Sequence, residues 1–259
     1  MAGLRLPRLH RGAWAVTRRN LLVWRRLLGP AIVLNFGEPT LYLLGLGLGL
    51  GHFVGSMGEM PYLAFLASGI VASSAMTTAS FEGMYSVYTR MVPQRTYEAM
   101  LATPLEVDDI IAGEMLWCGI KALMSAAAII TVATLLGVVA GPEVLLALPV
   151  ALLTGLCFAG PAIVMSTLAS NYDFFNYYFV LVITPMLLVS GVFYPLETLP
   201  EAMQFAVQLL PLAHAVALTR PLVAGGSVDA PLLHLSVLCG YTVVSYFLAV
   251  SLARRRLLV

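Results

Sequence analysis

Charged residues are scarce in this sequence. Only 10% of the 259 residues are Asp, Glu, Lys or Arg, whereas 60% are hydrophobic. The mean hydropathy is +0.91. A soluble domain carries about 25% charged residues, so the composition excludes a water-soluble globular fold. The net charge of +1 excludes nucleic acid as a bulk electrostatic partner.

Cysteines are few, and recognisable catalytic motifs are missing. Cys118, Cys157 and Cys239 all lie in apolar runs, which argues against a disulfide framework. The sequence holds no Walker motif, no dinucleotide fingerprint and no HExxH motif, and its histidines match no metal spacing. An intramembrane serine hydrolase would need Ser190 and His214 to converge, but no nucleophile motif supports that pair. We therefore expect no catalytic residue and no metal site in this chain.

Six apolar runs are long enough to cross a bilayer, whose core of about 30 Å requires roughly 20 helical residues. They cover residues 30–52, 62–85, 110–139, 144–169, 174–194 and 232–252. Prolines in the fourth and fifth runs are tolerated where neighbouring helices satisfy the freed carbonyls. The sequence thus predicts an all-α integral membrane protein, with residues 1–259 forming a single transmembrane domain of six helices.

Basic residues predict the orientation of these spans. Of the 14 Lys and Arg residues, twelve flank the spans on one side. These are Arg5, Arg8, Arg11, Arg18, Arg19, Arg25, Arg26, Arg90, Arg95, Arg254, Arg255 and Arg256. The positive-inside rule places this side, with both termini, in the cytoplasm. The arginine-rich start shares its lack of acidic residues with transit peptides, but no cleavage site follows, so we expect it to be retained.

The segment 12–29 is predicted to be an amphipathic helix lying in the membrane interface. At 100° per residue, its arginines share an arc of about 120°. The members of this arc are Arg11, Arg18, Arg19, Arg25 and Arg26, with Trp14, Val16, Leu21, Trp24, Leu27 and Leu28 opposite. Tryptophan with arginine is typical of interfacial helices. The helix is either an anchor before the first span or a lever that also contacts a cytoplasmic partner.

The cytoplasmic loop 90–103 is longer than the two to eight residues that a helix connector needs. Pro93 suits the first turn of a helix, and Pro104 suits its end. Arg95 and Glu98 would lie on its polar side and Tyr97 on its apolar side. The loop is therefore a docking surface or, alternatively, a solvated helix on the membrane surface.

Residues 195–213, on the outer side, are too apolar for a free loop and too rich in proline for a simple span. We expect a re-entrant helical hairpin in the outer leaflet, with Glu197 and Glu201 near its outer end. An ordinary interfacial helix is the alternative.

Ionisable residues within the apolar runs are limited to Glu38, Glu82, Glu114 and Lys121. Each costs about 2.5–3.5 kcal/mol at the centre of a helix, so each needs a partner or water. Glu114 and Lys121 are too far apart in sequence for a direct pair at i,i+4 spacing. These four residues either line a transport pathway or form structural bonds between helices. The glycine run Gly45, Gly47, Gly49 and Gly51 lacks the lysine of a phosphate-binding loop and is predicted to pack helices together.

Several segments together resemble the permease subunits of type-2 ABC exporters. They are RRNLLVWRR, EPTLYLLGLGLGLG, TRMVPQRTYEAM, ITPMLLVSGVFYPLETLP and PLAHAVALTRP. The resemblance runs along nearly the whole chain. Within the family, the stretch YLAFLASGIVASSAMTTASFE and the terminal RRRL are most similar to nodulation-factor exporter permeases of the NodJ type.

The resemblance implies a non-catalytic permease that exports a lipo-oligosaccharide or related glycolipid across a bacterial cytoplasmic (inner) membrane. Two copies would pair, and each would dock a separate ATPase subunit that binds ATP and Mg. Residues 90–103 would form the coupling helix. Its ATPase contacts would be Arg90, Arg95, Thr96 and Glu98, and the outer hairpin would gate the exit through Phe193, Tyr194 and Glu197.

Two further expectations stay open. Tyr172, Phe174, Phe175, Tyr177 and Tyr178 open the fifth span, where they line a path for sugar rings or form an interfacial aromatic belt. The alternative function is an ion-gradient-driven secondary exporter using Glu38, Glu82 and Lys121. Such proteins usually contain paired broken helices in corresponding halves, and the sequence has no convincing repeat. A lipid-modifying enzyme would need a polar catalytic cluster that this sequence lacks.

Overall fold

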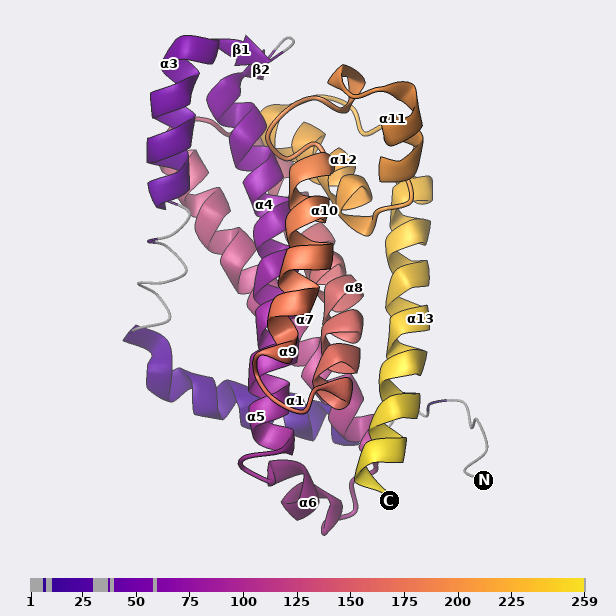
Figure 1. The fold of residues 1–259 in the computed structure, drawn as a ribbon. Helices are drawn as coiled ribbons and strands as arrows, with labels where there is room; N and C mark the ends of the chain where they lie inside the picture. Colours follow the sequence, from indigo (N-terminus) through magenta and orange to yellow (C-terminus); the bar gives the residue numbers. More distant parts are fainter. Residues whose placement is uncertain (1–6, 8–10, 30–36, 38–39, 58–59, 259) are drawn as a thin grey trace.

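The computed structural model describes residues 7, 11–29, 37, 40–57 and 60–258 of the chain. Figure 1 shows an elongated bundle of helices with a short antiparallel hairpin at its upper end, where β1 (Ser56–Met57) pairs with β2 (Met60–Pro61). Glu38, one of the four predicted intramembrane charges, lies outside the described residues.

Four helices in the described part of the chain are long and apolar enough to cross a membrane. The first, Tyr62–Met91, joins α4 (Tyr62–Phe81), the π-helical segment η3 (Glu82–Ser86) and α5 (Val87–Met91). The others are α7 (Val107–Leu135), Pro142–Leu168, which joins η4 (Pro142–Leu146) to α8 (Ala147–Leu168), and α13 (Pro231–Leu257). They correspond to the second, third, fourth and sixth predicted spans. The second was predicted to end at Tyr85, but its helix continues to Met91 and so includes Arg90.

The first and fifth predicted spans correspond to shorter apolar helices. Thr40–Val54 contains η2 (Leu43–Leu50) and α3 (Gly51–Val54), and most of residues 30–39 lie outside the described part. Phe174–Val189 joins α9 (Phe174–Tyr178), η5 (Phe179–Ile183) and α10 (Thr184–Val189). This helix ends before Gly191, whose positive φ of 76° favours glycine and turns the chain.

The predicted outer hairpin, residues 195–213, contains η6 (Leu196–Thr198) and α11 (Glu201–Val207). It leads into α12 (Pro211–Ala224), a helix that the sequence analysis did not predict. The axes of α11 and α12 are bent by 89°, as in a broken span or a re-entrant loop. Counting this pair, the described residues hold four or five candidate spans, and the total of six stays a prediction.

The long helices run side by side, and shorter elements close both ends of the bundle (Figure 1). α4 is central, because 78% of the residues in an 18-residue stretch of its span are buried, against 22% for the peripheral α13. One end, called here the α6 end, carries α1 (Gly12–Trp24), α6 (Thr96–Leu101) and the C-terminal end of α13. α1 lies across the bundle and continues into η1 (Arg25–Leu27). The opposite end, called the α11 end, carries α3, the hairpin and α11.

Local sequence signals set where several helices begin. Pro142, Pro211 and Pro231 occupy the first turns of η4, α12 and α13, where the missing N–H costs nothing. α7 begins after a capping box, in which the backbone N–H of Glu106 donates to Asp109 Oδ2 at 3.2 Å. The capping box thus fixes where α7 begins.

Pro93 does not start a helix, so that prediction was wrong. It lies in the turn after α5, and α6 begins only at Thr96. The physical reason is the backbone of Arg95, which adopts a left-handed conformation (φ 49°, ψ 30°) and interrupts any helix that would start earlier.

Within the glycine run, Gly47 is in close contact with a neighbouring helix of the described chain, whereas Gly45 and Gly49 are not. A Cβ at Gly47 would collide with Leu63 of α4, so this glycine lets the two segments approach closely. A Cβ at Gly45 or Gly49 would meet no atom of the described chain within 4 Å. Gly45 and Gly49 therefore face away from the described part of this protomer.

Arg256 caps the end of α8, and its removal is expected to destabilise the fold. Its Nη1 donates to the carbonyl oxygens of Ser166, Thr167 and Ala169 at 3.0, 2.6 and 2.9 Å. These are terminal helix carbonyls with no helical partner. Arg256→Met should lower the free energy of unfolding by about 1.5–3 kcal/mol. Thermal denaturation of the purified full chain in detergent measures this change.

The matched control is Arg255→Met, because Arg255 is the exposed neighbour on the same helix. We expect it to change the stability by less than about 0.5 kcal/mol. Equal losses for the two variants would contradict the capping role.

Candidate functional site

Four charged side chains meet inside the bundle towards its α6 end. They are Glu82 of η3, Arg90 of α5, and Glu114 and Lys121 of α7, and we call them the ionic cluster. Arg90 Nη2 lies 2.7 Å from Glu114 Oε2 and 3.3 Å from Glu82 Oε1. Lys121 Nζ lies 3.9 Å from Glu82 Oε2. Two carboxylates and two cations leave the cluster without net charge.

Helical spacing brings these charges together. Glu82 and Arg90 lie about two turns apart along one continuous helix, and so do Glu114 and Lys121 on α7. Because this continuous helix packs against α7, Arg90 pairs with Glu114 and Glu82 pairs with Lys121 across the two helices, and Arg90 also pairs with Glu82 on its own helix. Glu114 is fully buried, whereas the side chains of Glu82 and Lys121 keep 12% and 19% of their exposure.

The N-terminal helix α1 is joined to this cluster through α7. Asn20 Nδ2 donates to Glu114 Oε2 at 2.9 Å, and Thr17 Oγ1 donates to the carbonyl of Gly113 at 3.0 Å. A Cβ at Gly113 would come within 2.6 Å of the Ala13 carbonyl oxygen, so only glycine permits this approach. α1 is therefore fixed to α7 by two hydrogen bonds and a close backbone contact.

The buried face of α1 shares Val16 with the predicted apolar side but otherwise differs from both predicted faces. It consists of small and polar side chains at helical spacing, namely Ala13, Val16, Thr17 and Asn20. Trp14 on the predicted apolar side is 64% exposed, and Arg18, Arg25 and Arg26 are exposed as well. Burial, with Arg90 nearby, lowers the pKa of Arg19. Trp24 lies closer to the cluster, with its ring centroid 6.2 Å from that of Trp117 and 5.9 Å from Lys121 Nζ.

α6 has one buried residue and an exposed polar surface. Tyr97 is fully buried, and burial, with Glu114 nearby, raises its pKa well above the ordinary value, so the phenol stays neutral. Arg95 and Glu98 are 76% and 64% exposed and form an ion pair of 3.8 Å. Thr96 is partly exposed beside them, whereas Arg90 keeps only 13% exposure. Of the four predicted ATPase contacts, three are therefore at the surface and Arg90 lies behind it.

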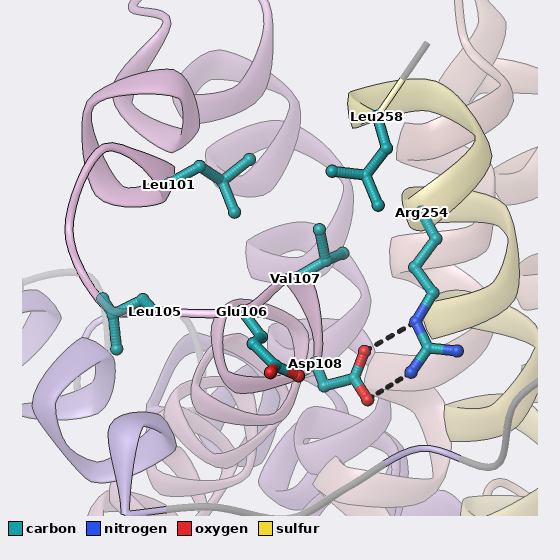
Figure 2. Close-up of a pocket in the computed structure, with 7 residues that line it drawn as sticks. All are labelled: Leu101, Leu105, Glu106, Val107, Asp108, Arg254 and Leu258. Carbon is teal, nitrogen blue, oxygen red and sulfur yellow. Dashed lines mark hydrogen bonds and ion pairs between the residues drawn. The ribbon is translucent and has the colours of Figure 1, made fainter.

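A second ionic contact joins α13 to the start of α7. Figure 2 shows Arg254 reaching Asp108, with its Nε donating to Oδ1 at 2.7 Å and its Nη2 donating to Oδ2. The pair borders a pocket of about 320 Å³ lined also by Leu101, Leu105, Glu106, Val107 and Leu258. The sequence analysis used Arg254 only as an indicator of orientation and did not identify this contact.

The aromatic residues predicted at the start of the fifth span do not share one face. Phe175 is fully buried and Tyr178 nearly so, whereas Tyr177 is 65% exposed and Tyr172 is 41% exposed. Phe174 is partly buried and packs against Tyr177. Tyr172 and Phe175 instead pack with Tyr85 and Tyr88 of the long second span.

At the α11 end, the segment that holds Phe193, Tyr194 and Glu197 is fixed by Arg220. Arg220 Nη2 donates to the Gly191 carbonyl at 2.6 Å, and its guanidinium lies 3.7 Å from the ring centroid of Phe65. Phe193 and Tyr194 are partly buried, and Glu197 is exposed. The sequence analysis assigned no role to Arg220, and it missed this contact because the contact depends on the unpredicted helix α12.

Comparison with known proteins identifies close relatives. Residues 11–222 match the family model described as "ABC-2 type transporter". The chain is 46% identical over 244 residues to Nodulation protein J of Rhizobium leguminosarum bv. trifolii, covering 94% of this chain and 93% of that protein. It is 44% identical, with the same coverage, to Nodulation protein J of Rhizobium meliloti (strain 1021). It is 27% identical to the inner membrane transport permease YadH of Escherichia coli (strain K12), over 92% of this chain and 91% of that protein.

Proposed function

Because the chain belongs to the family of ABC-2 type transporters, we propose that it is the membrane-spanning permease subunit of an ATP-driven exporter. The main support for the proposal is the way α6 is packed against the α6 end of the bundle. α6 is a short helix with exposed charges, and its buried Tyr97 lies beside the ionic cluster that joins α5 and α7. Such a helix can receive a push from a partner and pass it to the long helices.

The partner in this proposal is a separate ABC ATPase subunit, present in two copies, which binds ATP and Mg. Arg95, Thr96 and Glu98 form its contact surface, because all three are accessible. Closure of the ATPase pair moves α6, and the motion passes through Tyr97 and Arg90 into the bundle. The ATPase then shifts the permease between two states, because its affinity for one of them differs from its affinity for the other.

We further propose the arrangement in a bacterial inner membrane. The α6 end, where nearly all basic residues of the described chain lie, faces the cytoplasm, and both termini are cytoplasmic. Six spans cross the bilayer, α1 lies in the cytoplasmic interface, and the bent pair α11–α12 forms the outer re-entrant hairpin. Two copies of the chain pair to enclose the pathway.

The proposed cargo is a lipo-oligosaccharide or related glycolipid. Support comes from the 46% identity to a Nodulation protein J over 94% of this chain. The sugars would cross between the two protomers while the acyl chain stays towards the lipid. An export of this kind needs no catalytic group in the permease itself.

Reconstitution in liposomes tests the proposal. The chain is inserted together with an ABC ATPase subunit, and a fluorescent acylated chitotetraose is the cargo. We expect translocation with ATP and Mg, and none from the chain alone or with a non-hydrolysable ATP analogue. Translocation by the chain alone that an uncoupler abolishes would instead support a secondary exporter and overturn the proposal.

A further inference from the structure

One face of the central span is polar. Between residues 74 and 91, all of which the structure describes, every side chain that keeps partial or full exposure is hydroxylic, charged or aromatic. They are Ser74, Thr77, Thr78, Phe81, Glu82, Tyr85, Ser86, Thr89 and Arg90. The aliphatic residues of this stretch are all buried. A face of this composition does not suit contact with acyl chains, because polar groups at membrane depth are found against protein or a water-filled cavity.

The polar face is hollowed into a groove. Seven residues line a cavity of about 360 Å³ that opens to the outside of the protomer, namely Thr77, Thr78, Phe81, Glu82, Tyr85, Ser86 and Lys121. We call it the polar groove. This volume lies within the range of about 300–1,000 Å³ typical of small-molecule sites. Glu82 lies about 13 Å along the helix from its end at Met91, given a rise of 1.5 Å per residue. The groove is therefore within the half of the span nearer to the α6 end.

Lys121 provides the groove with hydrogen-bond donors. Within the described residues Lys121 Nζ forms an ion pair with Glu82 Oε2, but their distance of 3.9 Å is too long for a hydrogen bond. The other Glu82 oxygen already accepts from Trp117 Nε1 at 3.0 Å and from Arg90 Nη2 at 3.3 Å. An ammonium group that is ion-paired but not hydrogen-bonded can still donate its N–H groups to an acceptor in the groove. The groove is thus suited to a guest that carries acceptor oxygens.

Charge and shape indicate which guest fits. The ionic cluster has no net charge, so a phosphate would gain no net electrostatic attraction from it. Phe81 is 50% exposed, and its ring stacks on Tyr85 with centroids 5.5 Å apart. Tyr85 in turn stacks on Tyr172, at 6.1 Å and an interplanar angle of 8°. Flat apolar ring faces bordered by hydroxyl groups match a pyranose ring, which has apolar C–H faces and a hydroxylated edge.

We propose that the polar groove binds a sugar ring of the exported amphiphile within the cytoplasmic half of the membrane. Lys121 donates to a hydroxyl or amide carbonyl oxygen of the sugar, and Phe81 and Tyr85 pack on its apolar face. The glycolipid cargo and the orientation rest on the proposed function. The binding itself needs neither the ATPase nor ATP.

Binding of acylated chitotetraose to the purified full chain tests the groove. The chain is placed in nanodiscs of phosphatidylcholine without any ATPase. Trp24 and Trp117 lie beside Lys121 and Glu82 and report occupancy by their fluorescence, after Trp14→Phe removes the exposed third tryptophan. We expect a saturable signal for wild type, and at least tenfold weaker binding for Lys121→Met and for Phe81→Ala.

The matched control is Thr131→Ala, because Thr131 is an exposed hydroxyl on α7 outside the groove, and its affinity should equal that of wild type. Phe81 is half exposed, so Phe81→Ala tests the groove without a large effect on folding. No binding to wild type, or unchanged affinity in both groove variants, would overturn the inference. Equal competition by dodecyl phosphate would also overturn it, in favour of a lipid phosphate site.

A second copy of the chain is the other occupant to test. Thr78→Cys is combined with Cys239→Ser, which removes the exposed native cysteine, since Cys118 and Cys157 are buried. A disulfide between two copies that leaves no probe binding would make the face a protomer contact and overturn the inference. The two proposals fail separately: ATP-driven export with unchanged groove affinities refutes the groove alone, and groove binding with ATP-independent export refutes the ATP-driven mechanism alone.

Discussion

Replacing Glu114 with alanine is expected to destabilise the protein by about 3–5 kcal/mol, the cost of breaking a buried ion pair. Glu114 is fully buried, and its Oε2 accepts from Arg90 at 2.7 Å and from Asn20 at 2.9 Å. Its loss leaves part of the Arg90 charge uncompensated and the Asn20 amide without its acceptor. Because these bonds join α1, α5 and α7, we expect the helices to separate cooperatively at a lower temperature.

Thermal denaturation of the full chain in detergent measures this loss. Glu98→Ala is the matched control, since its exposed pair with Arg95 should contribute less than about 1 kcal/mol. The double variant Arg90→Met/Glu114→Met should recover part of the stability, because apolar replacement of both members removes the unpaired charge. Equal stability of Glu114→Ala and Glu98→Ala would show that the cluster does not hold the helices together.

Reversing the charge of Arg95 is expected to reduce ATP-driven export at least tenfold without changing stability. Arg95 is 76% exposed, so its side chain contributes little to the packing of the bundle. Arg95→Glu would replace the ion pair with Glu98 by two like charges and reverse the charge that α6 presents to the proposed ATPase, and like charges facing each other across an interface cost several kcal/mol. The measurement compares cargo translocation in liposomes with the melting temperature of the same preparation.

Arg255→Glu is the control for this second variant, because it reverses an exposed charge at the same end of the bundle but on α13. Its export should equal that of wild type. Full export by Arg95→Glu would remove α6 from the proposed ATPase contact, whereas loss of both export and stability would assign Arg95 a structural role.

Hydropathy predicted the long helices well, because burial in lipid or protein leaves the same apolar signature. The run 110–139 became α7 (Val107–Leu135), and the run 232–252 became α13. Local breaks were harder to predict. Helix α12 was not predicted because Pro211 and Pro221 argue against a helix in this segment. Pro211 is nevertheless compatible with a helix because it lies in the first turn, and Pro221 is tolerated because the helix around it is packed.

The site was only partly predictable, because partner choice depends on the register between helices. Glu82, Glu114 and Lys121 were identified from their cost in an apolar run, but nothing local indicated that Arg90 would pair with two of them. Arg90 was assigned to the loop because the apolar run ends at Tyr85, whereas the helix continues to Met91 through a π-helical segment. The role of Asn20 could not be predicted either, since its partner Glu114 lies 94 residues away.

The low burial of α13 has a consequence for the environment that the protein requires. Only 22% of an 18-residue stretch of this helix is buried within the described protomer, so most of its surface is left open to acyl chains in a bilayer. Its tilt will therefore respond to bilayer thickness, and hydrophobic mismatch will act on it before it acts on the enclosed α4. Membrane composition thus influences how tightly α13 packs against the other helices.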